Sequence, residues 1–323
     1  MIVKKDRDEI VSYLEDSSNI KNGNAKVVFI PESEEEIIQL VKEKSKEKFP
    51  LTISGGGTGT VGGRIAKEGG IISLENFNKI KFIDKEKKRA NLESGVVVDN
   101  FLKELDKYSL FYPPFPTERT AFIGGNVSTN ASGEYSFKFG PTRKYVEKIR
   151  MVRSNGEVME IKRGEIFEKN GFIDYGSFKV PLPSYRTPEV KCSAGYYSKE
   201  GMDGIDLLIG SEGTLGIFTE VEVSVIESLP ERFIIILFIE DEENIPEIVR
   251  NIKKEKNFLQ LFSLEFFDKN ALKFLRNDFP EIPENTCAIY CEGVSDVEKM
   301  ERWAEIAEEL KAVDTMIGED PTN

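Results

Sequence analysis

The sequence predicts an α+β fold in two parts, which meet near residue 230. Between residues 26 and 74, short apolar strand patterns surround one amphipathic helix pattern. Between residues 79 and 161, most of the patterns are strands that follow one another in pairs. After Pro230, strand and helix patterns alternate. Mixed patterns of this kind are typical of domains that pack helices on a sheet.

The first part begins with a β-α-β-loop-β pattern. Ser33 followed by Glu36 forms a capping box, which predicts the start of a helix. Apolar residues then recur on one face of that helix. The predicted elements are a short helix over 6–14, a strand over 26–30, the capped helix to residue 48, and strands over 50–53 and 71–74.

Strand pairs dominate the middle of the chain. Asn155-Gly156 predicts a two-residue hairpin turn. Residues 163–204 are predicted to be irregular, and a loop of this length is more often functional than idle. The predicted elements are strands over 79–83 and 89–93, a helix that ends near residue 108, and strands over 146–153, 158–161 and 221–226.

The second part predicts a ferredoxin-like layout of two successive β-α-β units. Cys287 and Cys291 share one of its strands, about 13 Å apart, whereas a disulfide needs Cα atoms closer than about 7 Å. We expect both to be small buried apolar residues. The predicted elements are strands over 233–240, 260–267, 286–292 and 313–317, and helices over 243–256, 268–277 and 296–310.

Composition excludes several classes of function. The 44 basic and 57 acidic residues give a formal charge of −13, which argues against a nucleic-acid-binding face. No apolar run approaches the roughly 20 residues of a membrane span. The N-terminus lacks the apolar core of a signal peptide, so we expect a cytoplasmic protein. The chain has no histidine, the commonest general base and metal ligand, and we expect no metal site.

One glycine-rich stretch, residues 54–63, predicts an anion-binding loop. Six of its ten residues are glycine and none is charged, so backbone N–H groups can converge without side chains in the way. A flexible surface turn is the alternative. Gly57, Gly59 and Gly62 match a dinucleotide fingerprint, but that fingerprint requires a helix to begin at the glycines. Residues 63–70 show no apolar stripe, so loop amides rather than a helix would hold an anion here.

Two further stretches, residues 112–142 and 206–220, share this chemistry. They are rich in glycine, threonine, serine and asparagine. Each stretch alone is a plausible turn. Their recurrence suits a long heteroaromatic cofactor with a pyrophosphate in its middle.

Four segments carry a resemblance to a known family. They are SGGGTGTVGG at 54–63, PPFPTERTAFIGGNVSTNASG at 113–133, FGPTRKYV at 139–146 and DLLIGSEGTLGIFTEVEVSVI at 206–226. In their sequence, order and spacing, the chain resembles the FAD-linked oxidases and dehydrogenases with a vanillyl-alcohol-oxidase-type (PCMH-type) flavin domain. Within that family it is similar to the glycolate and D-lactate dehydrogenase branch.

The resemblance implies a domain organisation. It covers residues 20–230 well and the remainder loosely. It implies a PCMH-type FAD-binding domain over 1–229, made of two subdomains with a boundary near residue 84. A partial ferredoxin-like α+β cap for the substrate would follow over 230–323.

The resemblance also implies a set of FAD-binding residues. The loop from Gly55 to Thr60 would hold the pyrophosphate, the middle segments would follow the ribityl chain and the isoalloxazine ring, and the 206–226 segment would contact the adenine end. The implied residues are Gly55, Gly56, Gly57, Thr58, Gly59, Thr60, Gly62, Gly63, Pro114, Pro116, Ile123, Gly124, Gly125, Asn126, Thr129, Asn130, Gly133, Gly140, Thr142, Glu212, Gly213, Gly216 and Ile217.

The implied activity is oxidation of a 2-hydroxy acid by hydride transfer to flavin N5. A base would take the hydroxyl proton, and an arginine would pair with the substrate carboxylate. The candidates for carboxylate binding are Arg186 and Arg143, and Tyr196 or Lys199 could touch the substrate. Alternatives are a non-catalytic FAD-binding subunit and an alkyl-glycerone-phosphate-synthase-like reaction.

The chain departs from the family in its histidines. Because it has none, and no cysteine in the four segments, we expect FAD to be bound non-covalently. Dehydrogenases of this branch carry a histidine motif in the second half of the cap, and this chain ends before that point. Three explanations for the missing histidine motif are open. The chain is a truncation, a partner subunit supplies the histidines, or the chemistry has changed.

Overall fold

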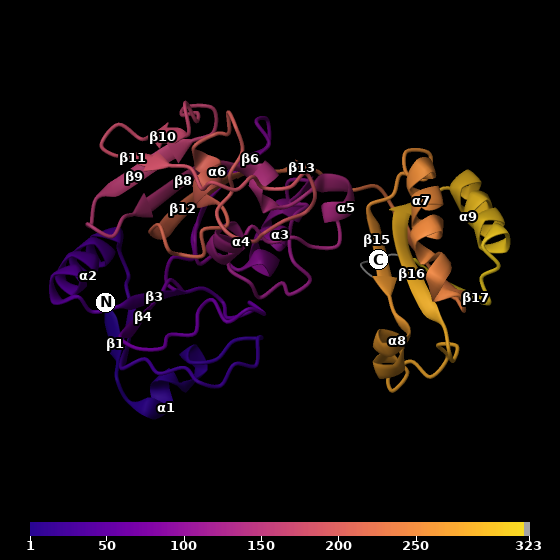
Figure 1. The fold of residues 1–323 in the computed structure, drawn as a ribbon, viewed down its shortest axis with the longest axis horizontal. Helices are drawn as coiled ribbons and strands as arrows, with labels where there is room; N and C mark the ends of the chain where they lie inside the picture. Colours follow the sequence, from indigo (N-terminus) through magenta and orange to yellow (C-terminus); the bar gives the residue numbers. More distant parts are fainter. Residues whose placement is uncertain (320–323) are drawn as a thin grey trace. The chain divides into compact units, whose positions relative to one another are not determined.

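The computed structural model describes residues 1–319 and confirms the α+β class (Figure 1). The chain forms two compact units. Residues 1–133 and 140–227 make the first unit, and residues 134–139 join residues from 228 onward in the second. The chain therefore leaves the first unit after Gly133 and returns to it at Gly140.

A four-stranded sheet with the order β1-β2-β4-β3 opens the first unit. Strands β2, β4 and β3 run parallel, and β1 pairs antiparallel with β2. Helix α2 (Glu34–Glu47) packs its apolar face, which includes Ile37 and Leu40, into a buried cluster with this sheet. The elements of this region are β1 (Ile2–Lys4), α1 (Arg7–Ile10), η1 (Val11–Tyr13), β2 (Val27–Ile30), β3 (Leu51–Ser54) and β4 (Gly70–Ser73).

Only half of the predicted capping box forms at the start of α2. Ser33 Oγ accepts a hydrogen bond from Glu36 N at 3.3 Å, as predicted. The Glu36 carboxylate, however, accepts from Glu32 N at 2.8 Å instead of from Ser33 N. The Glu36 carboxylate also pairs with the N-terminal amine of Met1 at 2.6 Å. This contact favours a hydrogen bond from Glu32 N over one from Ser33 N.

A five-stranded antiparallel sheet with the order β5-β6-β12-β8-β9 follows. Strand β12 begins at Ile217, four residues before the predicted strand at 221. The elements are β5 (Ile80–Asp84), β6 (Arg89–Glu93), α3 (Val98–Asp106), β7 (Leu110–Phe111), η2 (Thr142–Tyr145), β8 (Val146–Val152), β9 (Val158–Lys162), β12 (Ile217–Ser224) and β13 (Ile226–Glu227).

The predicted two-residue turn at Asn155-Gly156 is wrong. Gly156 N donates to Arg153 O at 2.9 Å, so the turn starts at Arg153 and its central residues are Ser154 and Asn155. Gly156 has φ +78° and forms a bulge before the strand resumes. This is a three-residue hairpin, in which the glycine occupies the left-handed position after the turn.

Residues 163–204 are less irregular than predicted. Two short strands, β10 (Phe172–Asp174) and β11 (Lys179–Pro181), pair antiparallel. Ile173 packs with Met202 and Leu207 in a small buried cluster. Helix α6 (Ile205–Leu208) follows this segment.

The second unit has the predicted ferredoxin-like topology. Its antiparallel sheet has the order β15-β16-β14-β17, and α7 and α9 cover one face of it (Figure 1). Trp303, Cys287 and Cys291 are buried on that face, as expected for the cysteines. The elements are α5 (Ser136–Phe139), β14 (Arg232–Ile239), η3 (Glu242–Asn244), α7 (Ile245–Glu255), β15 (Ser263–Phe267), α8 (Lys269–Leu275), β16 (Cys287–Val294), α9 (Val297–Glu309) and β17 (Asp314–Glu319).

No helix within residues 1–319 combines the length and the apolar character that crossing a bilayer requires.

One carboxylate ties α2 to the five-stranded sheet. Glu34 accepts two hydrogen bonds from Arg150, at 2.9 and 2.8 Å, and one from Thr219 at 2.8 Å. Burial raises the pKa of Glu34, but the bonds from Arg150 and Thr219 outweigh it, so its pKa lies below the ordinary 4.5. A carboxyl whose pKa falls on folding stabilises the fold above its unfolded pKa, and this contribution disappears as pH drops through the folded pKa.

We expect Glu34→Gln to lower the free energy of unfolding at pH 7 by about 1–2 kcal/mol, allowing for partial exposure to solvent. The difference from wild type should shrink as pH falls below 4.5. Urea unfolding at pH 7 and at lower pH measures both effects. Glu35→Gln, at an exposed position in the same helical turn, is the control and should change little. Equal losses in the two variants would contradict the role of Glu34.

Candidate cofactor-binding site

The glycine-rich stretch forms the loop that connects β3 to β4, and it contains no helix, as predicted. Gly57 and Gly62 have φ values of +78° and +77°, which side-chain-bearing residues adopt rarely. Ser17 N donates to Gly57 O at 3.2 Å, and Ile65 N donates to Gly62 O at 3.0 Å. Both bonds fix the loop backbone to residues on either side of it.

The second stretch forms a helix that the sequence analysis missed, α4 (Ile123–Thr129). Gly124 N donates to Ser94 O at 2.7 Å, and a Cβ added to Gly124 would lie 2.5 Å from Ser94 Cβ. The helix therefore packs directly against the chain after β6. A Cβ added to the next residue, Gly125, would meet no described atom within 4 Å, because Gly125 faces a cavity.

The third stretch is hydrogen-bonded to α4. Gly210 N donates to Val127 O at 3.0 Å, and Glu212 N donates to Ser128 O at 2.8 Å. Glu212 and Gly213 both have positive φ, +50° and +75°, which turns the chain toward the glycine loop. The three stretches thus surround one space.

That space is a cavity of about 140 Å³ that opens to solvent. It lies entirely within the first unit. All three stretches contribute to its wall. The predicted residues that line it are Gly55, Gly56, Gly57, Thr58, Gly59, Gly63, Gly124, Gly125, Asn126, Thr129, Glu212, Gly213 and Gly216.

The structure places the other predicted residues outside the lining, with several in structural roles. Ile217 is buried in the cluster with α2. Thr142 Oγ1 donates to Ala131 O at 2.8 Å, and Asn130 ends α4 in the left-handed conformation. A Cβ added to Gly133 would lie 1.8 Å from Phe115 O. The remaining members of this group are Thr60, Gly62, Pro114, Pro116, Ile123 and Gly140.

Three polar atoms in the cavity wall are buried and have no hydrogen-bond partner among residues 1–319. They are Ser94 Oγ, Asn126 Nδ2 and Asp16 Oδ2. Buried polar groups in folded proteins are nearly always hydrogen-bonded, so these atoms require a partner, which a polar ligand or a bound water would supply. Gly59 and Gly125, at which an added Cβ meets nothing within 4 Å, leave the backbone open to that ligand. A cofactor with several donors and acceptors fits this wall.

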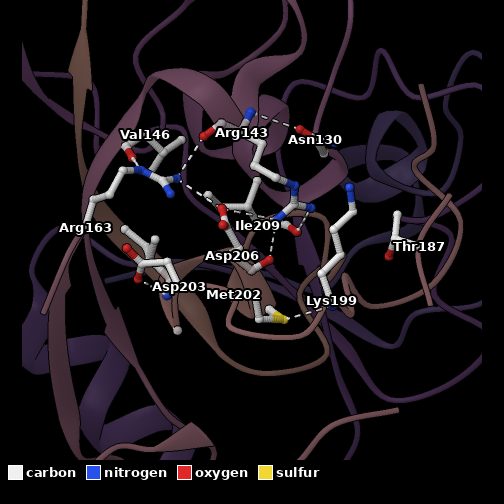
Figure 2. Close-up of polar contacts among 12 residues, drawn as sticks. Asn130, Arg143, Val146, Arg163, Thr187, Lys199, Met202, Asp203, Asp206 and Ile209 are labelled. Carbon is white, nitrogen blue, oxygen red and sulfur yellow. Dashed lines mark hydrogen bonds and ion pairs between the residues drawn. The ribbon is translucent and has the colours of Figure 1, made fainter. Parts of the chain in front are cut away.

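Arg143, a carboxylate-binding candidate, has partners within the protein (Figure 2). It donates to the backbone oxygens of Asp206 and Ile209, the latter at 2.6 Å, and pairs with the Asp206 carboxylate at 3.6 Å. Arg163 binds the same carboxylate at 3.1 Å. Burial lowers the pKa of Arg143, while Asp206 opposes this effect. Arg143 therefore holds the third stretch in place behind the cavity.

The other substrate candidates lie in or near the 163–204 segment and do not line the cavity. Arg186 is exposed. Tyr196 Oη lies 2.6 Å from Thr214 Oγ1. Lys199 pairs with Glu189 at 2.7 Å, which raises the pKa of Lys199. Among residues 1–319, no group of three or more His, Cys, Asp or Glu residues is arranged to hold a metal ion.

Comparison with known families identifies a cofactor for this part of the chain. Residues 25–162 match the family model described as FAD binding domain, and this range includes the glycine loop and α4. Residues 25–162 belong to this family of FAD-binding domains. Two of the three stretches that line the cavity, the glycine loop and α4, thus lie within the matched FAD binding domain.

Curated relatives of this FAD-binding chain are similar over most of its length. A D-lactate dehydrogenase from Anaerostipes hadrus is 33% identical over 304 residues, which cover 90% of this chain and 57% of the relative. The glycolate oxidase subunit GlcD of Bacillus subtilis is 29% identical over 81% of this chain and 49% of its own length. A D-2-hydroxyglutarate dehydrogenase from Xanthomonas citri pv. viticola is 26% identical over 84% of this chain and 51% of its own length. The chain spans about half the length of these relatives.

Solved structures agree with this fold. An alkyldihydroxyacetonephosphate synthase superimposes with a TM-score of 0.69 over 99% of this chain and 58% of that chain, at 17% sequence identity. At this identity, the similarity shows a shared fold and nothing about shared chemistry.

The cavity includes residues that the sequence analysis missed. Asp16, Arg64 and Ser94 line it, and all three lie outside the four family-like segments. Arg64 directly follows the glycine loop, which is the one local signal that could have drawn attention to it. Asp16 and Ser94 have no such signal.

Proposed function

We propose that this chain is an FAD-dependent oxidoreductase, or part of one, that acts on a 2-hydroxy acid such as D-lactate, glycolate or D-2-hydroxyglutarate. The observation that carries this proposal is the single cavity built from three glycine-rich stretches, in a chain whose relatives include enzymes named for these acids. In this proposal residues 1–229 bind FAD, and residues 230–323 form part of a substrate cap.

The proposed FAD site is non-covalent. The chain has no histidine, and its three cysteines, Cys192, Cys287 and Cys291, lie outside the cavity lining. The N–H groups of the loop from Gly55 to Gly59, the part that lines the cavity, hold the pyrophosphate without a cationic ligand. Asn126 and Ser94 then satisfy their unpartnered atoms on the cofactor, and the other predicted cofactor residues outside the lining support the wall.

Bound FAD supplies a two-electron acceptor for the substrate carbon. The chain's own residues bind and orient the substrate in this proposal. Arg186 is the exposed guanidinium that could pair with the substrate carboxylate, because Arg143 is committed to Asp206 and two backbone oxygens. The group that takes the hydroxyl proton is not a histidine of this chain.

A second candidate is a flavin-carrying part of a larger assembly that does not oxidise a hydroxy acid by itself. Two observations favour it: the chain lacks histidine, and one relative is named as a subunit, GlcD. In this case a partner subunit would complete the catalytic site, and an electron acceptor would receive electrons from the flavin.

Anaerobic mixing separates these candidates. The full chain loaded with FAD is mixed with D-lactate, glycolate or D-2-hydroxyglutarate, and L-lactate serves as the stereochemical control. Loss of the visible flavin absorbance with a D-acid or glycolate supports the first candidate. Bound flavin that none of these acids bleaches supports the second. A chain that never acquires flavin contradicts both.

A further inference from the structure

An arginine connects the N-terminal segment to the glycine loop. Arg64 donates to Glu15 O through Nε at 2.8 Å and through Nη2 at 2.6 Å, and also to Ser12 O. Its Nη1 donates to Ser54 Oγ and to Gly55 O, both at 3.3 Å. These bonds match the five N–H donors of a guanidinium. Arg64 is the one cationic side chain in the described cavity lining, yet protein acceptors already use its donors.

The N-terminal segment therefore forms a fixed wall of the cavity. A Cβ added to Gly57 would lie 2.5 Å from the Arg64 guanidinium, and one added to Gly62 would lie 2.6 Å from Ile20 Cδ1. Ser17 N also donates to Gly57 O at 3.2 Å. These close approaches leave little room for a side chain at Gly57, beside Arg64, or at Gly62, beside Ile20.

Asp16 is the residue of this segment that reaches the cavity. Its Oδ1 accepts from Ser18 N at 2.9 Å and from Ser18 Oγ. Its Oδ2 is buried, belongs to a side chain in the cavity lining, and has no hydrogen-bond partner among residues 1–319. An ionised carboxylate can only accept hydrogen bonds, so Oδ2 requires a donor. Phosphate oxygens cannot provide one and would be repelled by the carboxylate.

We propose that Asp16 is a cofactor-binding residue whose Oδ2 accepts a hydrogen bond from a hydroxyl or amine group of FAD. The proposal rests on FAD binding in this cavity. It assigns a cofactor contact to a segment that precedes the matched domain at residues 25–162. Arg64 acts as a positioning residue, because it holds residues 12–15 against the loop so that Asp16 faces the ligand.

The test is Asp16→Asn in the full chain. Asparagine can keep the oxygen that accepts from Ser18, and it places an NH₂ donor where Oδ2 faces the cofactor. We expect FAD, titrated by flavin fluorescence into the apoprotein, to bind about tenfold more weakly or worse, as for loss of a hydrogen bond to a charged group. Asp8→Asn removes the same charge at an exposed position outside the lining and should bind FAD like wild type.

Displacement of FAD by ADP and by FMN locates the donor. A selective loss of ADP affinity in Asp16→Asn places the donor on the adenosine half, and a selective loss of FMN affinity places it on the flavin half. FAD affinity equal to or tighter than that of wild type overturns the proposal. If wild type itself fails to bind FAD, the cofactor assignment fails instead.

Thermal unfolding of the apoproteins separates binding from folding. Asp16→Asn should melt close to wild type, because its contacts with Ser18 persist. If Asp16→Asn does not fold, Asp16→Ser replaces it, since serine can still bond to the Ser18 backbone. Wild-type FAD affinity in that folded variant also overturns the proposal.

Discussion

The Gly125→Leu substitution is expected to abolish FAD binding and leave the apoprotein folded. Gly125 lies inside α4, and an ideal Cβ there meets no described atom within 4 Å. A leucine side chain would extend into the cavity, where FAD binds in our proposal. We expect FAD affinity to fall at least about 100-fold, since the bulk occupies the binding space. Replacing glycine by leucine inside a helix should raise its stability by up to about 1 kcal/mol. Fluorescence titration of FAD and urea unfolding of the apoprotein measure the two effects.

Gly124→Ala is the matched control, one residue away in the same helix. It brings a similar gain in helix propensity, but its Cβ would lie 2.5 Å from Ser94 Cβ and 2.8 Å from Ser94 O. We expect it to lower the free energy of unfolding by about 1–3 kcal/mol, the usual cost of overpacking. Neighbouring glycines should thus give opposite results for stability. Wild-type FAD affinity in Gly125→Leu would show that the cofactor lies elsewhere.

The elements that the sequence predicted well are those with local signals. Helix α2 has a capping serine and an apolar face, and the alternation of strands and helices after Pro230 leaves few topologies other than the observed one. In β14, the alternating side chains Phe233, Ile235 and Leu237 face one helix layer, as the strand period requires. Caps, periodicity and short connections act within a few residues, so they can be read from the chain.

Helix α4 could not be predicted because its stability comes from tertiary contacts. Adjacent glycines at 124 and 125 disfavour a helix intrinsically. Gly124 is nevertheless required, since Ser94 allows no side chain there, and Gly125 leaves room for the ligand. The Asn155-Gly156 turn was mispredicted for a different reason, because the same dipeptide fits both a two-residue turn and a three-residue hairpin.

The sequence predicted the residues of the cavity wall only where glycine-rich stretches form that wall. The three stretches carry that mark, whereas Asp16 and Ser94 have ordinary local sequences and reach the wall through the fold. Arg143 is the opposite kind of error, a residue that the sequence assigned to the site although the structure gives it another role. Its charge suggested a substrate ligand, but its acceptors at Asp206 and Ile209 lie 63 and 66 residues away in the chain. A sequence alone does not reveal that such acceptors are already in place.

In the second unit, Arg232→Met is expected to cause the largest loss of stability. Glu292 is buried, with its side chain 6% exposed, and its carboxylate pairs with Arg232 at 3.1 Å. Tyr135 Oη donates to the same carboxylate at 2.6 Å. Burial and the adjacent Glu292 raise the pKa of Tyr135, so its hydroxyl stays a donor. Removing the arginine leaves a buried charge without its counter-ion, which costs about 3–5 kcal/mol. Trp303, the chain's one tryptophan, is buried in this unit, so its fluorescence during urea unfolding reports the loss directly.

Arg302→Met is the control, since it removes an arginine of the same unit from a more exposed ion-pair network. Arg302 contacts Glu255 at 2.7 Å and Glu309 at 2.9 Å, and the Glu309 side chain is 61% exposed. Water can solvate these carboxylates after the substitution, so we expect a loss of about 1 kcal/mol or less. The double variant Arg232→Met with Glu292→Gln should recover part of the stability that Arg232→Met loses, because the glutamine is neutral. Similar losses for Arg232→Met and Arg302→Met, or no recovery in the double variant, would show that the buried charge does not govern the stability of this unit.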